Sequence, residues 1–221
     1  MKKAFTLFVV AAALQYVTYG AITAGDLAII EFQSDNPDAL KVVALSDLSV
    51  GEVINFTDNG WQSSGSFRSN EGTSTYTVGS GGIAAGTVLT IDVGSMQFST
   101  SGDQVLVYQG SSSSPTFIYG LNGEGSAVWQ ANATSSNTSA LPTGLVNGAT
   151  AIALSEADNY VYSGITTGTQ AELLAAIGTT ANWTSSNSPL AGFSGTFTVV
   201  PEPATMALLG LGGLVLARRK K

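Results

Sequence analysis

The 221-residue chain contains no cysteine and no histidine. Their absence excludes disulfides, cysteine nucleophiles, Ser-His-Asp triads and His/Cys zinc sites. Basic residues are also scarce, because Lys41 and Arg68 face 14 carboxylates between residues 21 and 200, a net charge of about −12. Such an acidic surface repels phosphate backbones. We therefore expect no nucleic-acid partner and no enzymatic activity.

The N-terminus has the order of a secretory signal peptide. Lys2 and Lys3 precede an apolar run of 11 residues, 4–14, and small residues follow at Gly20 and Ala21. A basic start, an apolar run and small residues are the three parts of such a peptide. We expect residues 1–20 to be removed on export.

Residues 21–200 form one predicted domain rich in short β-strands. Many runs combine β-branched and aromatic residues, several alternate apolar with polar positions, and Asp/Asn/Gly-rich turns separate them. The runs span residues 27–32, 41–46, 52–57, 73–78, 87–93, 104–109, 116–120, 149–154, 159–163 and 195–200. Short strands at this spacing predict an all-β, antiparallel sandwich or barrel.

One segment, residues 168–178, has the pattern of a helix instead. Thr169 is followed three residues later by Glu172, the spacing of a capping box, and Gly178 stands where the helix should end. Leu173 and Ile177 share a face with Leu174. The sequence therefore predicts one short amphipathic helix packed on the sheet.

Three blocks of the domain resemble a known family. They are FTDNGW (56–61), GGIAAGTVLTI (81–91) and FSTSGDQVLVYQG (98–110). In this order they are similar to blocks of bacterial lamin-tail-domain-like proteins, over somewhat less than half of the chain. The resemblance implies an immunoglobulin-like β-sandwich that serves as an accessory or surface module and not as a catalyst.

Carboxylates gather in two of the turns. Asp35 and Asp38 lie in one turn and Asp58 in the other. Oxygen ligands suit Ca²⁺, so these three aspartates are a candidate metal site, although they lack the EF-hand spacing. The alternative role is turn formation by their side-chain oxygens. Together with Glu71 they could also supply the carboxylate pair of a glycan-active enzyme.

Aromatic residues suggest a second kind of binding site. The chain has three tryptophans and seven tyrosines. Trp129 and Trp183 are candidate platforms on which sugar rings could stack, whereas Trp61 is expected to fill the sandwich core. A carbohydrate-binding module for exopolysaccharide is therefore an alternative function.

The C-terminus joins three unlike segments. Val200, Pro201, Glu202 and Pro203 precede an apolar run of 14 residues, 204–217, and the basic residues Arg218, Arg219, Lys220 and Lys221 end the chain. As a helix the run would be roughly 21 Å long, whereas a bilayer core of ~30 Å needs about 20 residues. Cations stay in the cytoplasm, so the domain would lie outside. The segment predicts transient membrane anchoring.

These three segments, residues 201–221, resemble the PEP-CTERM sorting signal of Gram-negative bacteria. The resemblance implies an exosortase as partner, an intermediate in the inner membrane, and delivery to the cell surface or an extracellular polysaccharide matrix. From it we expect an exported structural or adhesive protein of the surface or biofilm. Sugar binding and glycan-active catalysis are the alternatives.

Overall fold

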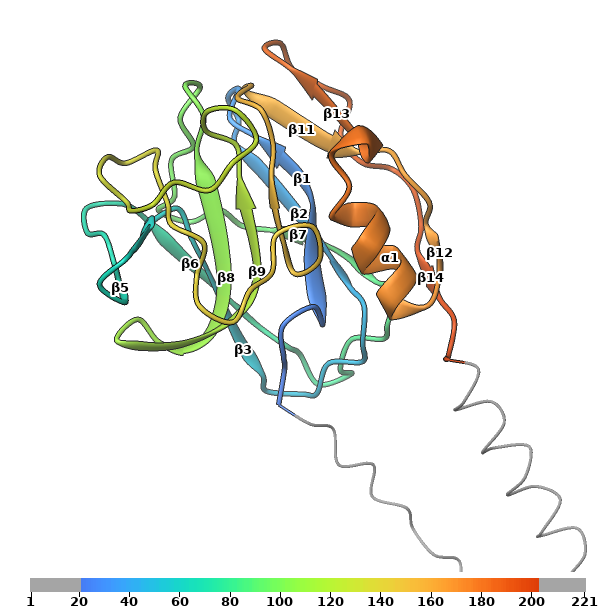
Figure 1. The fold of residues 1–221 in the computed structure, drawn as a ribbon. Helices are drawn as coiled ribbons and strands as arrows, with labels where there is room; N and C mark the ends of the chain where they lie inside the picture. The colour runs from blue at the N-terminus through green and yellow to red at the C-terminus, as the bar shows by residue number, and fades with distance from the viewer. Residues whose placement is uncertain (1–20, 203–221) are drawn as a thin grey trace, which may run out of the picture.

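The computed structural model describes residues 21–202, which fold into two five-stranded sheets packed face to face (Figure 1). In spatial order, the first sheet contains β13 (Trp183–Ser186), β11 (Asn159–Tyr162), β1 (Leu27–Gln33), β2 (Ala39–Ala44) and β7 (Val88–Ile91). The second contains β10 (Ala151–Ala153), β9 (Ser114–Asn122), β8 (Gln104–Ser111), β3 (Val53–Thr57) and β6 (Thr73–Thr77). The all-β sandwich prediction is confirmed.

Antiparallel pairing dominates both sheets. The first sheet is antiparallel throughout, and in the second only β10 runs parallel to its neighbour β9. Two short pairs lie outside the sheets: β4 (Trp61–Gln62) with β5 (Ser66–Phe67), and β12 (Thr167–Gly168) with β14 (Thr198–Val199). A 3₁₀ turn, η1 (Thr180–Asn182), precedes β13. The sequence did not predict β4, β5, β12 or β13.

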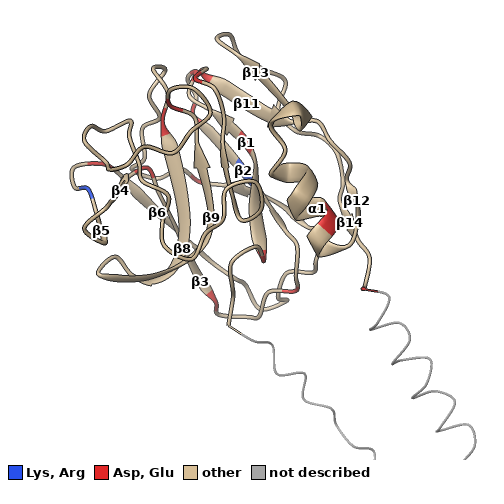
Figure 2. Ribbon diagram, viewed as in Figure 1, with Lys and Arg blue, Asp and Glu red and all other residues tan. Residues whose placement is uncertain are grey.

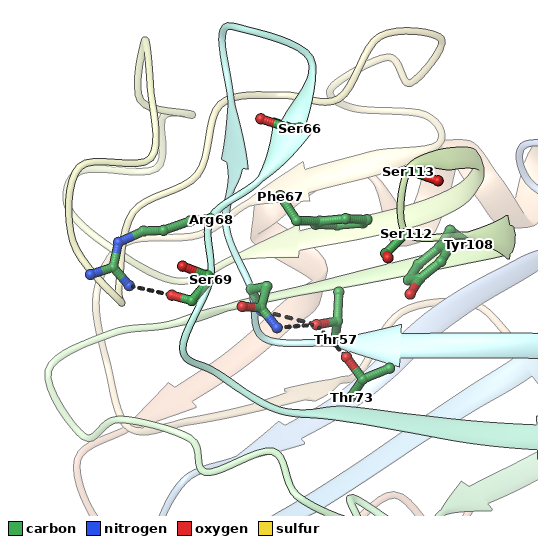
Figure 3. Close-up of a pocket in the computed structure, with 10 residues that line it drawn as sticks. Thr57, Ser66, Phe67, Arg68, Ser69, Thr73, Tyr108, Ser112 and Ser113 are labelled. Atoms are coloured by element: carbon green, nitrogen blue, oxygen red, sulfur yellow. Dashed lines mark hydrogen bonds between the residues drawn. The ribbon is translucent and has the colours of Figure 1, made fainter.

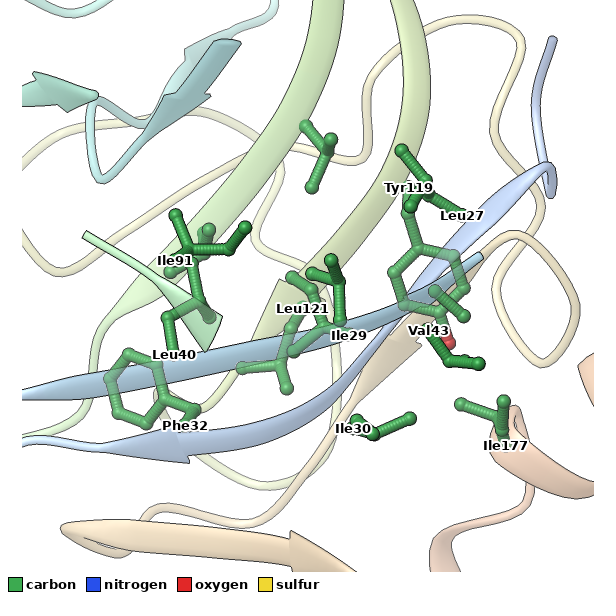
Figure 4. Packing of buried hydrophobic residues seen from close by; sticks show 14 of the residues in the cluster. Leu27, Ile29, Ile30, Phe32, Leu40, Val43, Ile91, Tyr119, Leu121 and Ile177 are labelled. Atoms are coloured by element: carbon green, nitrogen blue, oxygen red, sulfur yellow. The ribbon is translucent and has the colours of Figure 1, made fainter. Parts of the chain in front are cut away.

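The main core lies between the sheets. All seven residues of β1 are buried, and its Leu27, Ile29 and Phe32 pack in one cluster with Leu121 of β9 and Ile91 of β7 (Figure 4). Burial of β1 along its whole length means that both faces of this strand are covered. Side chains of the long apolar strands therefore hold the two sheets together.

A helix and a loop cover the second face of β1. The helix α1 (Gln170–Ile177) has the predicted capping box between Thr169 and Glu172, and its Leu173 and Ile177 are fully buried. It is followed by Gly178, where a larger residue does not fit because a Cβ would collide with the Gly148 carbonyl. The predicted helix is confirmed.

The loop beside α1, residues 187–197, is called the C-terminal strap below. It crosses the first sheet and is tied to the buried Glu31, whose carboxylate accepts the Phe193 N–H at 2.6 Å. Lys41 pairs with the same carboxylate at 2.9 Å and donates to the Phe193 carbonyl at 2.9 Å. Because Lys41 neutralises Glu31, a charge pair holds the strap in place.

A second apolar cluster lies on the outer face of the second sheet. Leu106 and Tyr108 of β8 belong to it, whereas Val105 and Val107 point into the main core, as alternation along a strand requires. Trp61 is buried, 7% exposed, in this second cluster. The prediction that Trp61 is buried is right, but its place between the sheets is wrong, because the β4–β5 hairpin carries it over the opposite face.

Candidate functional site

The folded body passes directly into the C-terminal segment. β14 pairs with β12, and the Thr198 N–H donates to the Thr166 carbonyl at 2.8 Å. The Val200 N–H makes the next bond, to the Gly168 carbonyl at 2.9 Å. Pro201 has no N–H and cannot extend this ladder.

Beyond Val200 the chain emerges from the body. Pro201 and Glu202 are exposed and border an open groove of about 490 Å³, whose other walls include Asp47 and Gln170. The two ends of the described chain, where the coloured ribbon meets the grey trace, both lie in the lower part of the body in Figure 1. The Pro-Glu segment thus begins at the surface, one residue after the last backbone hydrogen bond to β12.

The second candidate site is a pocket of about 400 Å³ on the other side of the molecule (Figure 3). We call it the aromatic pocket, because Phe67 of β5 and Tyr108 of β8 line it, together with Asn59 and Arg68. Besides Tyr108, its hydroxyl-bearing residues are Thr57, Ser66, Ser69, Thr73, Ser112 and Ser113. In Figure 1, β5 lies at the left of the body and α1 and β14 lie at the right.

Comparison with known proteins identifies the C-terminal segment. Residues 199–221 match the family model of the PEP-CTERM protein-sorting motif. The chain carries a PEP-CTERM sorting signal. No curated protein and no solved structure matches the chain. The resemblance to lamin-tail-domain-like proteins, and the immunoglobulin-like fold that it implies, therefore stay predictions.

The PEP-CTERM motif marks an exported protein that an exosortase processes at the membrane, as the sequence predicted. The matched region begins at Val199, in β14, so its first residues belong to the folded body. Pro203, the apolar run 204–217, the basic residues 218–221 and the predicted signal peptide, 1–20, lie outside the described residues. Between residues 21 and 202, the structure contains no helix with the length and apolarity needed to cross a bilayer.

The three predicted calcium ligands each accept hydrogen bonds from other groups of the protein. Asp35 accepts a hydrogen bond from Asn159 of β11 at 2.7 Å, and Asp38 accepts the Phe98 N–H at 2.8 Å. Asp58 accepts the N–H groups of Gly72 and Gln97 at 2.6 and 2.9 Å. Within the described part of the chain, no three Asp or Glu side chains converge in a way that suits a metal ion. Calcium binding stays a prediction.

Sequence reasoning missed a buried acidic cluster around Asp58. Burial raises the pKa of Asp103 to about 8, against hydrogen bonds from the N–H groups of Ser99 and Gln104 that lower it. Burial also raises the pKa of Glu71 to about 7, with repulsion from Asp58 adding to it. Asp58 and Glu71 border a pocket of about 360 Å³. In the sequence these acids are 45 residues apart at most, and no spacing motif connects them.

The two tryptophans predicted to stack on sugars differ in exposure. Trp183 is 9% exposed, its indole N–H donates to the Ile177 carbonyl at 2.8 Å, and Tyr162 contacts its ring edge-on. Trp129 is half-buried, and its indole donates to Asn147 at 3.1 Å. Of these two residues, only Trp129 presents substantial surface to solvent.

Acidic residues far outnumber basic residues in the body. Figure 2 shows carboxylates on both sheets and in many loops, against two basic residues. Lys41 is occupied by Glu31, whereas Arg68 lies at the rim of the aromatic pocket, 3.9 Å from Glu71. An exterior with so many carboxylates repels phosphate backbones.

Proposed function

We propose that this chain is a non-catalytic structural or adhesive protein of the cell surface or extracellular matrix of a Gram-negative bacterium. The observation that carries the proposal is the junction at Val200. There a compact sandwich makes its last backbone bond, and an exposed Pro-Glu segment begins. The sorting machinery therefore receives a body that is folded up to the signal itself.

The surface of the body supports a non-catalytic role. Among residues 21–202 the exposed large apolar side chains are aliphatic and scattered: Val50, Val53, Val128, Val146, Ile165 and Val200. Asp58, the central acid of the buried cluster, uses both carboxylate oxygens to hold backbone N–H groups. It thus serves the fold, and we do not propose the glycan-active enzyme.

Cleavage near the Pro-Glu-Pro segment is the first prediction. Proline fixes φ and the residue before it avoids helix, so the segment should present an extended target outside the membrane. Mass spectrometry of the surface protein should find a C-terminus close to residues 201–203 and no peptide from 204–221.

Two variants sharpen this experiment. Glu202→Ala should leave more of the unprocessed chain in the membrane, whereas Glu156→Ala, at another exposed glutamate, should be processed normally. Retention of residues 204–221 in the mature surface protein, with Glu202→Ala unchanged in size and location, would show that the tail is only an anchor.

The adhesive role has its own test. Cells that lack the chain should form a matrix that disperses under weaker shear, and the full chain should restore cohesion. A chain that ends at Val200 is exported without a sorting signal and should not restore it. Equal cohesion with and without the chain would contradict this role.

A further inference from the structure

We propose that the aromatic pocket binds a neutral pyranose unit of a polysaccharide. This inference rests on the proposed adhesive function and supplies its ligand. Neither Trp129 nor Trp183 lines the pocket, so it is a different place from the one that the sequence indicated. Three properties carry the proposal: a braced aromatic surface, hydroxyl groups around it, and a lining without unpaired charge.

The aromatic surface is Phe67, held in place by other rings. Its ring centroid lies 5.0 Å from that of Trp61, 5.1 Å from Tyr108 and 5.7 Å from Phe117. Trp61, Tyr108 and Phe117 are buried, whereas Phe67 is half-buried and lines the pocket (Figure 3). A ring that is already fixed loses little conformational entropy when an apolar sugar face packs on it.

Hydrogen-bonding groups surround that surface. The hydroxyls of Tyr108 and Ser112 make no hydrogen bond with any other residue in the range 21–202, and Tyr108 retains some exposure, 4%. On the opposite wall Thr57 accepts from Asn59 at 2.9 Å and from Thr73 at 3.2 Å, so that wall is already ordered. Fixed and free polar groups around an apolar surface match the alternating C–H and O–H groups of a pyranose.

Charge favours a neutral sugar over an acidic one. The pocket lining contains Arg68 and no carboxylate, but Glu71 already lies 3.9 Å from this guanidinium. A carboxylated sugar would have to approach Glu71 and a body of about −12 net charge. A neutral pyranose meets no such repulsion, and Arg68 can donate to its hydroxyls while it keeps its partner.

The position of the pocket suits a tethered protein. β5 and the β8–β9 turn lie on the left of the body in Figure 1, whereas β14 and the start of the sorting segment lie on the right. A chain held at its C-terminal end therefore keeps the aromatic pocket open to the surroundings.

The test is binding of the full-length chain, purified in detergent, to immobilised neutral glucans and mannans and to a polyuronate. We expect binding to at least one neutral polysaccharide, weaker binding to the polyuronate, and little change with salt. Phe67→Ala should weaken binding by about tenfold or more. The matched control Phe193→Ala removes another half-buried phenylalanine, in the C-terminal strap, and should bind normally.

A milder variant guards against misfolding. Tyr108→Phe keeps the ring cluster and removes only the free hydroxyl, so it should fold normally and lose about fivefold in affinity. Equal affinity of wild type, Phe67→Ala and Tyr108→Phe, preference for the polyuronate, or absence of binding to every neutral polysaccharide would overturn the proposal. If cells still lose cohesion without the chain, the adhesive function stands and only the pocket assignment fails. If the pocket binds sugar but cells without the chain keep their cohesion, the pocket assignment stands and the adhesive function fails.

Discussion

At the scale of single residues, the raised pKa of Asp103 can be tested through its effect on stability. It is 2% exposed, and burial raises its pKa from 3.8 to about 8. Between these two values the folded chain keeps a proton that the unfolded chain has released. The free energy of unfolding must then fall as pH rises.

We therefore predict that the protein is more stable at pH 5 than at pH 8. Asp103 should contribute a slope of about 1.4 kcal/mol per pH unit within that window. Urea unfolding at pH 5, 6.5 and 8 measures it, and Asp103→Asn should reduce the slope to the part that comes from Glu71, whose pKa is raised to about 7. Asp47→Asn, at an exposed aspartate, should not. Stability that rises with pH, or an equal slope in all three proteins, would be incompatible with a protonated Asp103.

Residue roles were predictable only where they are local. The sequence indicates that Asp58 and Gly60 form a turn, but the structure has no turn at residues 58–60. The partners of Asp58, Gly72 and Gln97, are distant in the chain. Gly60 is required for a long-range reason too, since a Cβ there would collide with the Thr138 carbonyl. No local pattern encodes such contacts.

At the scale of elements, apolar strands and the capped helix were predictable, because their signals are local. The runs 27–32 and 104–109 correspond to β1 and β8. By contrast, β13 has the sequence WTSS, which is mostly polar, and it is a strand because it pairs with β11. β4 and β5 have two residues each and depend on the aromatic cluster that they cover.

The cap of α1 provides a prediction at this scale. The Thr169 hydroxyl accepts the Glu172 N–H at 3.3 Å, and the Glu172 carboxylate accepts the Thr169 N–H at 2.8 Å. Thr169→Ala removes one acceptor and should lower the free energy of unfolding by about 1 kcal/mol. Thr169→Ser should restore most of it, and Thr180→Ala, at an exposed threonine outside the helix, should have little effect in the same urea titration. If Thr169→Ala left the free energy of unfolding unchanged, packing alone would determine where α1 begins.

At the scale of the whole molecule, composition and strand spacing were sufficient to predict the sandwich, and the terminal motif was sufficient to predict export. Apart from the helix α1, what covers the outer faces of the two sheets was not predictable. The C-terminal strap reaches β1 through Glu31 and Lys41, and the aromatic pocket joins residues between 57 and 113. These arrangements depend on pairing between segments far apart in the chain.

The C-terminal strap has a mechanical consequence. Tension applied at the C-terminal end enters the body at Val200, where β14 contributes only two paired residues. β14 should peel away at low force, and the strap should follow when the contacts of Phe193 with Glu31 and Lys41 break. Some 14 residues, 187–200, would then extend by up to roughly 50 Å at ~3.4 Å per residue, while the sandwich stays folded.

Single-molecule pulling between the two ends of the body should therefore record a short, reversible extension before the main unfolding event. Lys41→Met should lower the force of this first step, because the strap loses its charged contact. A single rupture without an earlier step would contradict the expected order. With this order, residues 187–200 extend before the sandwich is loaded to its unfolding force. If flow pulls on a cell that the protein holds, the strap therefore stretches first and the fold stays intact.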